Sequence, residues 1–160
     1  MKRYLFLLTV LLMFSPLFLA AQADAYNIFS VDIGYNVLIE PNGTPIREDT
    51  MSMGFNFRLT ERLTAGFELN NLVNTFLYVN ALKLKADIVP LIRAVMTYYP
   101  PSIAFTDGAF SLGMELLPIR RRTGGLSTEF KFLFDFIREA TFTATPDYGF
   151  RFGLVAGIGH

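Results

Sequence analysis

Alternation of apolar and polar side chains with a period of two is the feature that most constrains this sequence. Between residues 51 and 59 the odd positions carry Met, Phe or Leu, and the even positions carry Ser, Gly, Asn and Arg. Successive side chains of a strand point to opposite faces, so this pattern predicts an amphipathic β-strand. The same alternation recurs in residues 27–39, 63–70, 110–116, 126–136 and 148–158.

The alternation is least regular in residues 71–99. Residues 76–87 place Leu and Ala on one face and Lys and Asp on the other, although Asn80 falls among the apolar residues. A helix over residues 79–89 is the alternative, because Lys, Leu and Ala favour helices. We expect strands here, the second over residues 92–98, since the flanking segments are strands and a closed barrel needs them. The chain therefore predicts an all-β fold, a single antiparallel barrel of about eight strands.

The N-terminus has the pattern of an export signal. Two basic residues precede an uncharged apolar run over residues 4–20, and an A-x-A pattern then predicts signal-peptidase cleavage between Ala23 and Asp24. The alternative is a transmembrane anchor, since the run approaches the length that spans a bilayer. We expect a signal peptide over residues 1–23 and one barrel domain over residues 24–160.

Side-chain volume indicates which face of the barrel is outside. The chain has 17 Phe, most of them on the apolar faces, and the opposite faces are rich in Gly and Ser. The interior of an eight-stranded barrel is only wide enough for side chains to fill it, so this aromatic bulk does not fit inside. We expect the apolar face to meet lipid and the polar face to line the lumen, as in transmembrane β-barrels.

Six basic and six acidic side chains fall on the face assigned to the lumen. Charges confined away from water stay ionised only when they are paired, so we expect a network of ion pairs. Two solvated faces whose charges balance by chance are the alternative. The predicted lumen charges are Asp32, Arg58, Glu68, Lys83, Lys85, Asp87, Arg93, Glu115, Glu129, Lys131, Asp135 and Arg151.

With this architecture and the apolar alternation of its final strand, Tyr148 to His160, the chain resembles small outer-membrane barrels of the OmpA/OmpX/OmpW type. In that family the final strand ends in an aromatic residue and is read by the barrel-assembly machinery, whereas this chain ends in His160. The resemblance implies a location in the outer membrane of a diderm bacterium, contact with its lipid, and both termini in the periplasm. It also implies outward loops at residues 40–49, 70–75, 100–108 and 137–147.

The residues offer little catalytic chemistry. Some barrels of this kind are hydrolases that activate a Ser or water with a His. Here the only His is His160, next to Gly159. This position does not hold a side chain rigidly enough for a preorganised catalytic site. The chain has no Cys, no clustered His and no phosphate-binding glycine motif, and its formal net charge of zero does not indicate a nucleic-acid partner. We expect no enzymatic activity, no cofactor and no metal.

The run Arg120 to Arg122 is expected in a solvated connection from Pro118 to Gly125. A contact with anionic lipid head groups is the alternative for this run.

Three functions remain open from the sequence. The first is a membrane barrel with a structural or surface-interaction role. The second is a narrow, porin-like conduit for small or apolar solutes. The third is a soluble periplasmic barrel that carries a lipid.

Overall fold

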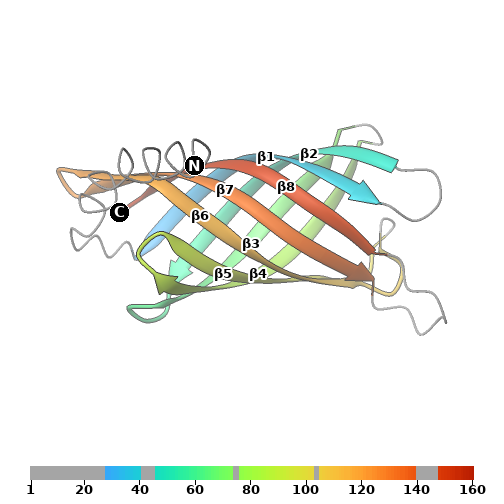
Figure 1. Ribbon diagram of the computed structural model, residues 1–160, viewed down its shortest axis with the longest axis horizontal. Coiled ribbons are helices and arrows are strands. Elements are labelled where there is room, and N and C mark those ends of the chain that lie inside the picture. The colour runs from blue at the N-terminus through green and yellow to red at the C-terminus, as the bar shows by residue number, and fades with distance from the viewer. Residues whose placement is uncertain (1–27, 41–45, 74–75, 103–104, 140–147) are drawn as a thin grey trace, which may run out of the picture.

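The computed structural model describes residues 28–40, 46–73, 76–102, 105–139 and 148–160, which form a closed antiparallel barrel. Each strand pairs with the next along the chain, and the first pairs with the last to close the barrel (Figure 1). The prediction of an all-β, eight-stranded antiparallel barrel is confirmed. The strands are β1 (Phe29–Glu40), β2 (Ile46–Arg58), β3 (Leu63–Leu72), β4 (Leu77–Val89), β5 (Ile92–Tyr99), β6 (Ala109–Thr123), β7 (Leu126–Glu139) and β8 (Tyr148–Gly159).

The two ends of the barrel differ in their connections. At one end, called the turn end here, the strands are joined through residues 59–62, 90–91 and 124–125. The backbone N–H of Ile28 also donates to the carbonyl of His160 there (3.0 Å), which joins the first strand to the last. At the opposite, loop end the connections are residues 41–45, 73–76, 100–108 and 140–147.

Residues 71–99 contribute two strands, β4 and β5, so the helical alternative for residues 79–89 is wrong. Asn80 is exposed on the outer face near the loop end, where it pairs with Leu69 of β3. Asn80 interrupts the apolar pattern of the outer face but not the backbone pairing between β3 and β4. In the described part of the chain, no helix is long and apolar enough to cross a membrane.

The expected connection from Pro118 to Gly125 is wrong, because β6 continues to Thr123 and only residues 124–125 form the turn. Gly124 and Gly125 both have positive φ (59° and 92°), which a two-residue hairpin of this kind requires. Pro118 is tolerated in the strand because it lies at a β-bulge, beyond the last residue of β6 that pairs with β5. Its missing N–H therefore removes no ladder hydrogen bond.

Three of the expected outward loops are shorter than predicted. Residues 46–49, 70–72 and 137–139 belong to strands, so the loop boundaries at 40–49, 70–75 and 137–147 are corrected. The resemblance to small outer-membrane barrels implied loops at these positions. Antiparallel pairing continues there nevertheless, because each backbone N–H and C=O gains a partner in the ladder.

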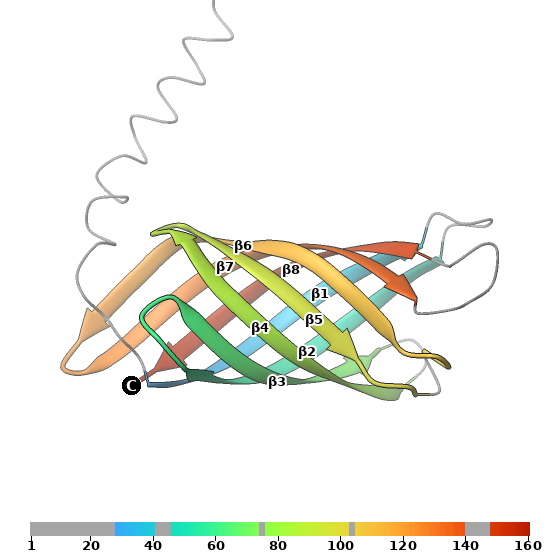
Figure 2. The same cartoon turned by 90° about the horizontal axis from the view of Figure 1, so that it is seen from below.

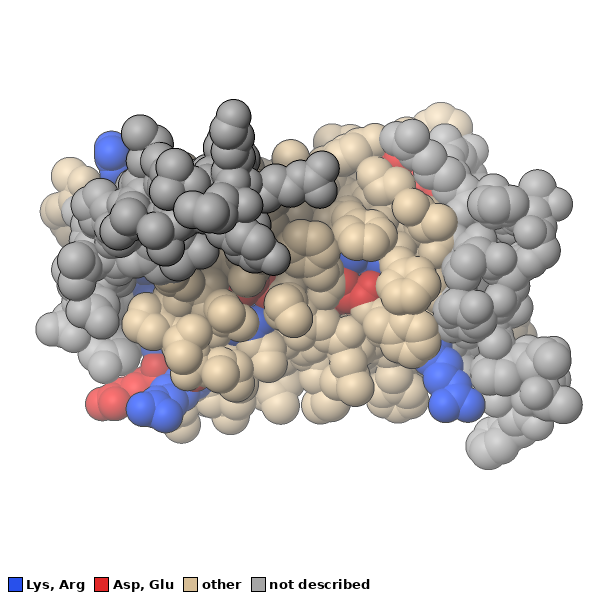
Figure 3. Space-filling model, in the orientation of Figure 1, with Lys and Arg blue, Asp and Glu red and all other residues tan. Residues whose placement is uncertain are grey.

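The outer surface of the barrel is apolar and the interior is polar. Strands β7 and β8 present an aromatic stripe on the outside, in which Phe134 packs edge-on against Phe152 and Phe136 packs at a tilt against Phe150. Figure 3 shows one face of the molecule, on which uncharged side chains cover most of the surface between the two ends. This arrangement inverts the usual distribution in water-soluble domains, in which apolar side chains fill the interior.

Candidate functional site: the lumen and its turn-end mouth

All twelve charged residues predicted for the lumen point into the barrel. Ten of them are at most 8% exposed, whereas the Arg58 and Asp87 side chains, at the turn end, are 12% and 22% exposed. Ion pairs join strands that are not neighbours in the barrel, such as Lys85 of β4 and Asp32 of β1 (Nζ–Oδ2 3.0 Å). Such pairs cross the interior, so the charged side chains fill the lumen.

Asp32 is the centre of the larger of two ion-pair networks. Its carboxylate accepts from the Lys85 ammonium (3.0 Å), from the Lys131 ammonium (2.7 Å) and from the Asn56 amide (2.9 Å). Lys131 also pairs with Glu129 (3.1 Å). One buried carboxylate thus joins side chains from four strands of the barrel.

The same network extends to the turn end through Glu115 and Arg93. Glu115 pairs with Lys85 (2.9 Å) and with Arg93 (3.2 Å), and Arg93 donates to Asp87 (2.6 Å). Arg58 reaches Asp87 from the other side (3.3 Å). With Arg120, described below, the turn-side network has five basic and four acidic members: Arg58, Lys85, Arg93, Arg120, Lys131, Asp32, Asp87, Glu115 and Glu129.

A second, loop-side network of two basic and two acidic residues lies nearer the loop end. Glu68 pairs with Lys83 and with Arg151 (3.2 Å), and Arg151 also pairs with Asp135. The guanidinium carbon of Arg151 lies 5.7 Å from the centroid of the Tyr99 ring, within the range of a cation–π contact. This network is balanced in formal charge, so burial leaves no net charge uncompensated within it.

Gly113 of β6 makes room for the Asp135 carboxylate. A methyl group built on Gly113 would overlap the Asp135 carboxylate and the Phe134 carbonyl oxygen of the neighbouring strand β7. Glycine at this lumen position therefore permits the close packing of the loop-side network.

An apolar cluster narrows the lumen above this network, at the loop end, and a small pocket remains between its side chains. Phe105, from the β5–β6 connection, turns inward and packs against Tyr99, with ring centroids 5.1 Å apart. A tight turn fixes Phe105, because its backbone N–H donates to the Ser102 hydroxyl (3.1 Å) and its carbonyl accepts from Gly108 (3.0 Å). We call this cluster the apolar plug; its buried members are Leu38, Val79, Ala81, Tyr99, Phe105, Ala109 and Ile137.

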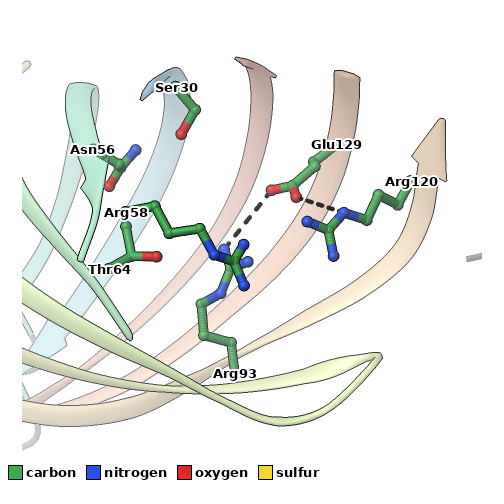
Figure 4. Close-up of a pocket in the computed structure, with 7 residues that line it drawn as sticks. All are labelled: Ser30, Asn56, Arg58, Thr64, Arg93, Arg120 and Glu129. Atoms are coloured by element: carbon green, nitrogen blue, oxygen red, sulfur yellow. Dashed lines mark ion pairs between the residues drawn. The ribbon is translucent and has the colours of Figure 1, made fainter. Parts of the chain in front are cut away.

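The turn end instead opens into a polar pocket in which three arginine side chains meet (Figure 4). Arg58, Arg93 and Arg120 come from β2, β5 and β6, and Glu129 of β7 lies between two of them. Glu129 pairs with Arg120 (3.1 Å) and lies 3.7 Å from Arg93. We call this pocket the arginine mouth; its lining residues are Ser30, Asn56, Arg58, Thr64, Arg93, Arg120 and Glu129.

Sequence reasoning missed Arg120 as a lumen residue. Strict alternation from the inward Glu115 places residue 119 inside and residue 120 outside. The β-bulge reverses this order, because Leu116 pairs with Phe132 while Ile119 pairs with Phe130, leaving one extra residue on β6. Pro118 could have indicated the bulge, because proline inside a sheet is found mainly at edges and bulges.

The remaining residues singled out in the sequence lie at the turn end or outside the described residues. His160 is exposed at the turn end, where its backbone N–H donates to the Phe29 carbonyl (2.9 Å). In the ranges that the structure describes, no group of three or more His, Cys, Asp or Glu is arranged to hold a metal ion. Ala23 and Asp24, the expected cleavage site, lie outside the described residues, and the signal peptide stays a prediction.

These observations define a closed barrel with an apolar exterior, two internal ion-pair networks, an apolar plug at one end and an arginine mouth at the other. Comparison of the chain with protein-family models, with curated proteins and with solved structures finds no match.

Proposed function

We propose that this protein is an integral outer-membrane β-barrel with a structural or surface-interaction role and no enzymatic activity. The observation that carries the proposal is the inverted distribution of side chains, with large apolar residues exposed outside and charges buried inside. Monomeric soluble proteins rarely expose contiguous apolar patches of more than a few hundred Å². A lipid environment removes this penalty, since the apolar exterior is then in contact with acyl chains.

Strand length and export both support a membrane location. The strands have 8 to 15 residues, and a tilted strand needs about 9–11 residues to cross the hydrocarbon core. The signal peptide expected over residues 1–23 would deliver the chain across the inner membrane. The resemblance to small outer-membrane barrels agrees with both features.

The filled lumen favours this role over a conduit. A solute crossing the barrel would have to pass the turn-side network, the loop-side network and the apolar plug in turn. Eight-stranded barrels have little interior space beyond what side chains occupy. We therefore expect no steady conductance in a planar bilayer; a steady conductance that Arg93→Ala or Asp87→Ala abolishes would favour the conduit.

Fractionation of cells tests the membrane location directly. The protein should be recovered with the outer membrane, require detergent for extraction, and migrate faster on a gel when it is not boiled. Recovery in buffer without detergent would instead favour the soluble, lipid-carrying barrel.

A pair of outward substitutions on β7 tests lipid contact without relying on fractionation. Phe132, in the middle of the strand, is 38% exposed, and Leu126, at the turn end, is 53% exposed. Arginine facing lipid costs about 2–4 kcal/mol at the midplane and about 0–1 near the interface. Phe132→Arg should therefore destabilise the refolded barrel in lipid vesicles far more than Leu126→Arg does. Equal tolerance of both substitutions would contradict contact with lipid.

A further inference from the structure

We propose that the arginine mouth binds a small oxyanion, a free phosphate or the phosphoryl group of a larger molecule, through Arg58, Arg93 and Arg120. This proposal depends on the geometry of the turn end and holds whether or not the barrel lies in a membrane.

Shared carboxylates hold the three guanidinium groups together. Asp87 accepts from Arg93 (2.6 Å) and from Arg58 (3.3 Å), so both guanidinium groups lie at one carboxylate. Glu129 has the same role for Arg120 (3.1 Å) and Arg93 (3.7 Å), as the dashed lines in Figure 4 show. The groups are positioned before any ligand arrives, which reduces the entropy cost of binding.

The charge of the lining selects an anion. Three arginines and one glutamate line the pocket, whereas Asp87 and Glu115 are not part of the lining. The turn-side network as a whole has five basic and four acidic members, one more positive charge than negative. The lining of the mouth therefore carries more basic than acidic side chains, whereas the loop-side network has equal numbers of both.

The chemistry of the lining favours an oxyanion over a halide. A guanidinium group presents planar, paired N–H donors that match carboxylate and phosphate oxygens. Ser30 and Thr64 add hydroxyl groups to the same pocket, and each can donate a hydrogen bond. A phosphate has enough oxygens to accept from several of these donors at once.

The β-bulge in β6 is an independent indication that the mouth is a built site. An unbulged strand would direct Ile119 into the mouth and Arg120 outward, as alternation from Glu115 requires. The extra residue between Leu116 and Ile119 reverses this and brings Arg120 to Glu129. Bulges are frequent at barrel rims and beside functional sites, where they redirect a side chain.

The β6–β7 hairpin also extends beyond the neighbouring β4–β5 hairpin at the turn end (Figure 2). Leu116 is the last residue of β6 that pairs with β5, and β6 then continues to Thr123. Arg120 is therefore carried on the part of β6 that projects past β5, and its side chain is 14% exposed in the mouth.

The test is phosphate binding by the protein purified from cells in a zwitterionic detergent, with inorganic phosphate as the probe in a calorimetric titration. The unchanged protein should bind phosphate saturably, and chloride at equal ionic strength should not compete. Arg120→Gln should weaken binding by about tenfold, because it removes a charge-assisted contact. Arg121→Gln is the matched control, since Arg121 is the adjacent residue and is exposed; it should leave phosphate affinity unchanged.

A second arm distinguishes free phosphate from a lipid head group. The protein is placed in nanodiscs of zwitterionic lipid, or of the same lipid with phosphatidic acid added. A lipid phosphoryl group would be assigned to the site if phosphate affinity is weaker in the phosphatidic acid discs than in the zwitterionic discs. This difference between the discs should disappear in Arg120→Gln. Unchanged affinity would assign it to a soluble anion.

Three outcomes would overturn the proposal: no saturable binding of phosphate or of phosphatidic acid, equal weakening by Arg120→Gln and Arg121→Gln, or competition by chloride at equal ionic strength. A faster-migrating unboiled band confirms that each variant is folded. Arg120→Lys keeps the charge and should retain part of the affinity, so its behaviour separates loss of the charge from loss of the fold.

Discussion

The two ends of the lumen are lined by different kinds of side chain. At the loop end, Tyr99 and Phe105 belong to the apolar plug, whose side chains surround a small, mainly apolar pocket. At the turn end, three arginines and Glu129 line a pocket open to solvent. The arginines project from strands, whereas Phe105 enters the lumen from the β5–β6 connection, so the ends differ in residue type and in the element that supplies the side chains.

The comparison indicates a division of roles along the barrel. An apolar plug excludes ions without needing a partner for each side chain. A charged interior remains stable only while each charge is compensated. The apolar lining therefore suits the loop end to excluding ions, and the charged lining suits the turn end to exchanging them with the solution. The predictions below test this division.

Removing Asp32 should have the largest effect on stability. Asp32→Ala leaves the ammonium groups of Lys85 and Lys131 with one acceptor fewer inside the barrel. Breaking a buried ion pair by removing one partner costs about 3–5 kcal/mol. The loss should be measured as the change in the free energy of unfolding in urea, with the barrel refolded in vesicles.

The double variant Asp32→Ala/Lys131→Met is the control for that experiment. It returns the turn-side network to its original excess of one positive charge. The double variant should therefore be more stable than Asp32→Ala alone. If it is less stable by the sum of both losses, the two residues are not coupled through charge.

A methyl group at Gly113 should have the next largest effect. Gly113→Ala would force the added carbon against the Asp135 carboxylate and the backbone of β7, which cannot move aside easily. Overpacking of this kind costs typically 1–3 kcal/mol, and the backbone contact favours the upper end. Gly54→Ala is the control, because its nearest neighbour would be the Cβ of Asp32 at 3.5 Å, an ordinary contact. Equal urea midpoints for the two variants would contradict tight packing at the loop-side network.

Removing the Phe105 ring should weaken the apolar plug. Phe105→Ala should cost about 2 kcal/mol, below the usual range for a buried Phe, because a connection can relax into the space more easily than a strand can. Phe76→Ala is the control at the same end, since Phe76 is 79% exposed and should change the unfolding free energy by less than about 0.5 kcal/mol. A similar loss in both variants would show that the plug contributes little.

Much of this molecule could be predicted from alternation alone. The inward position of Asp32, Glu68 and Lys131 follows from a strict period of two, and so do most of the strands, whereas the strands within residues 71–99 also needed the requirement that the barrel close. The partners within the lumen could not be predicted, because Asp32 meets Lys85 and Lys131 only after β1, β4 and β7 curve around the barrel. Barrel closure sets these contacts.

Two features escaped the sequence argument for different reasons. The apolar plug was overlooked although Leu38, Val79 and Ile137 have the same parity as the lumen charges on their strands. Strict alternation predicts this apolar layer, because it places these three side chains on the same face as the lumen charges. The inward turn of Arg120 could not follow from alternation, because a β-bulge adds a residue and reverses the faces beyond it.

The smallest expected effect concerns Asp87, at the exposed edge of the turn-side network. Its side chain is 22% exposed and pairs with Arg58 and Arg93. Partly exposed ion pairs contribute little, so Asp87→Asn should cost at most about 1 kcal/mol in low salt. The screening length is only about 3 Å in 1 M salt, so this cost should shrink there, whereas the cost of Asp32→Ala should change little. Unfolding free energies of both variants at low and high salt test this contrast. If the cost of Asp87→Asn persists in high salt, the arginine mouth is as dry as the centre of the lumen, and exchange of ions at the turn end is contradicted.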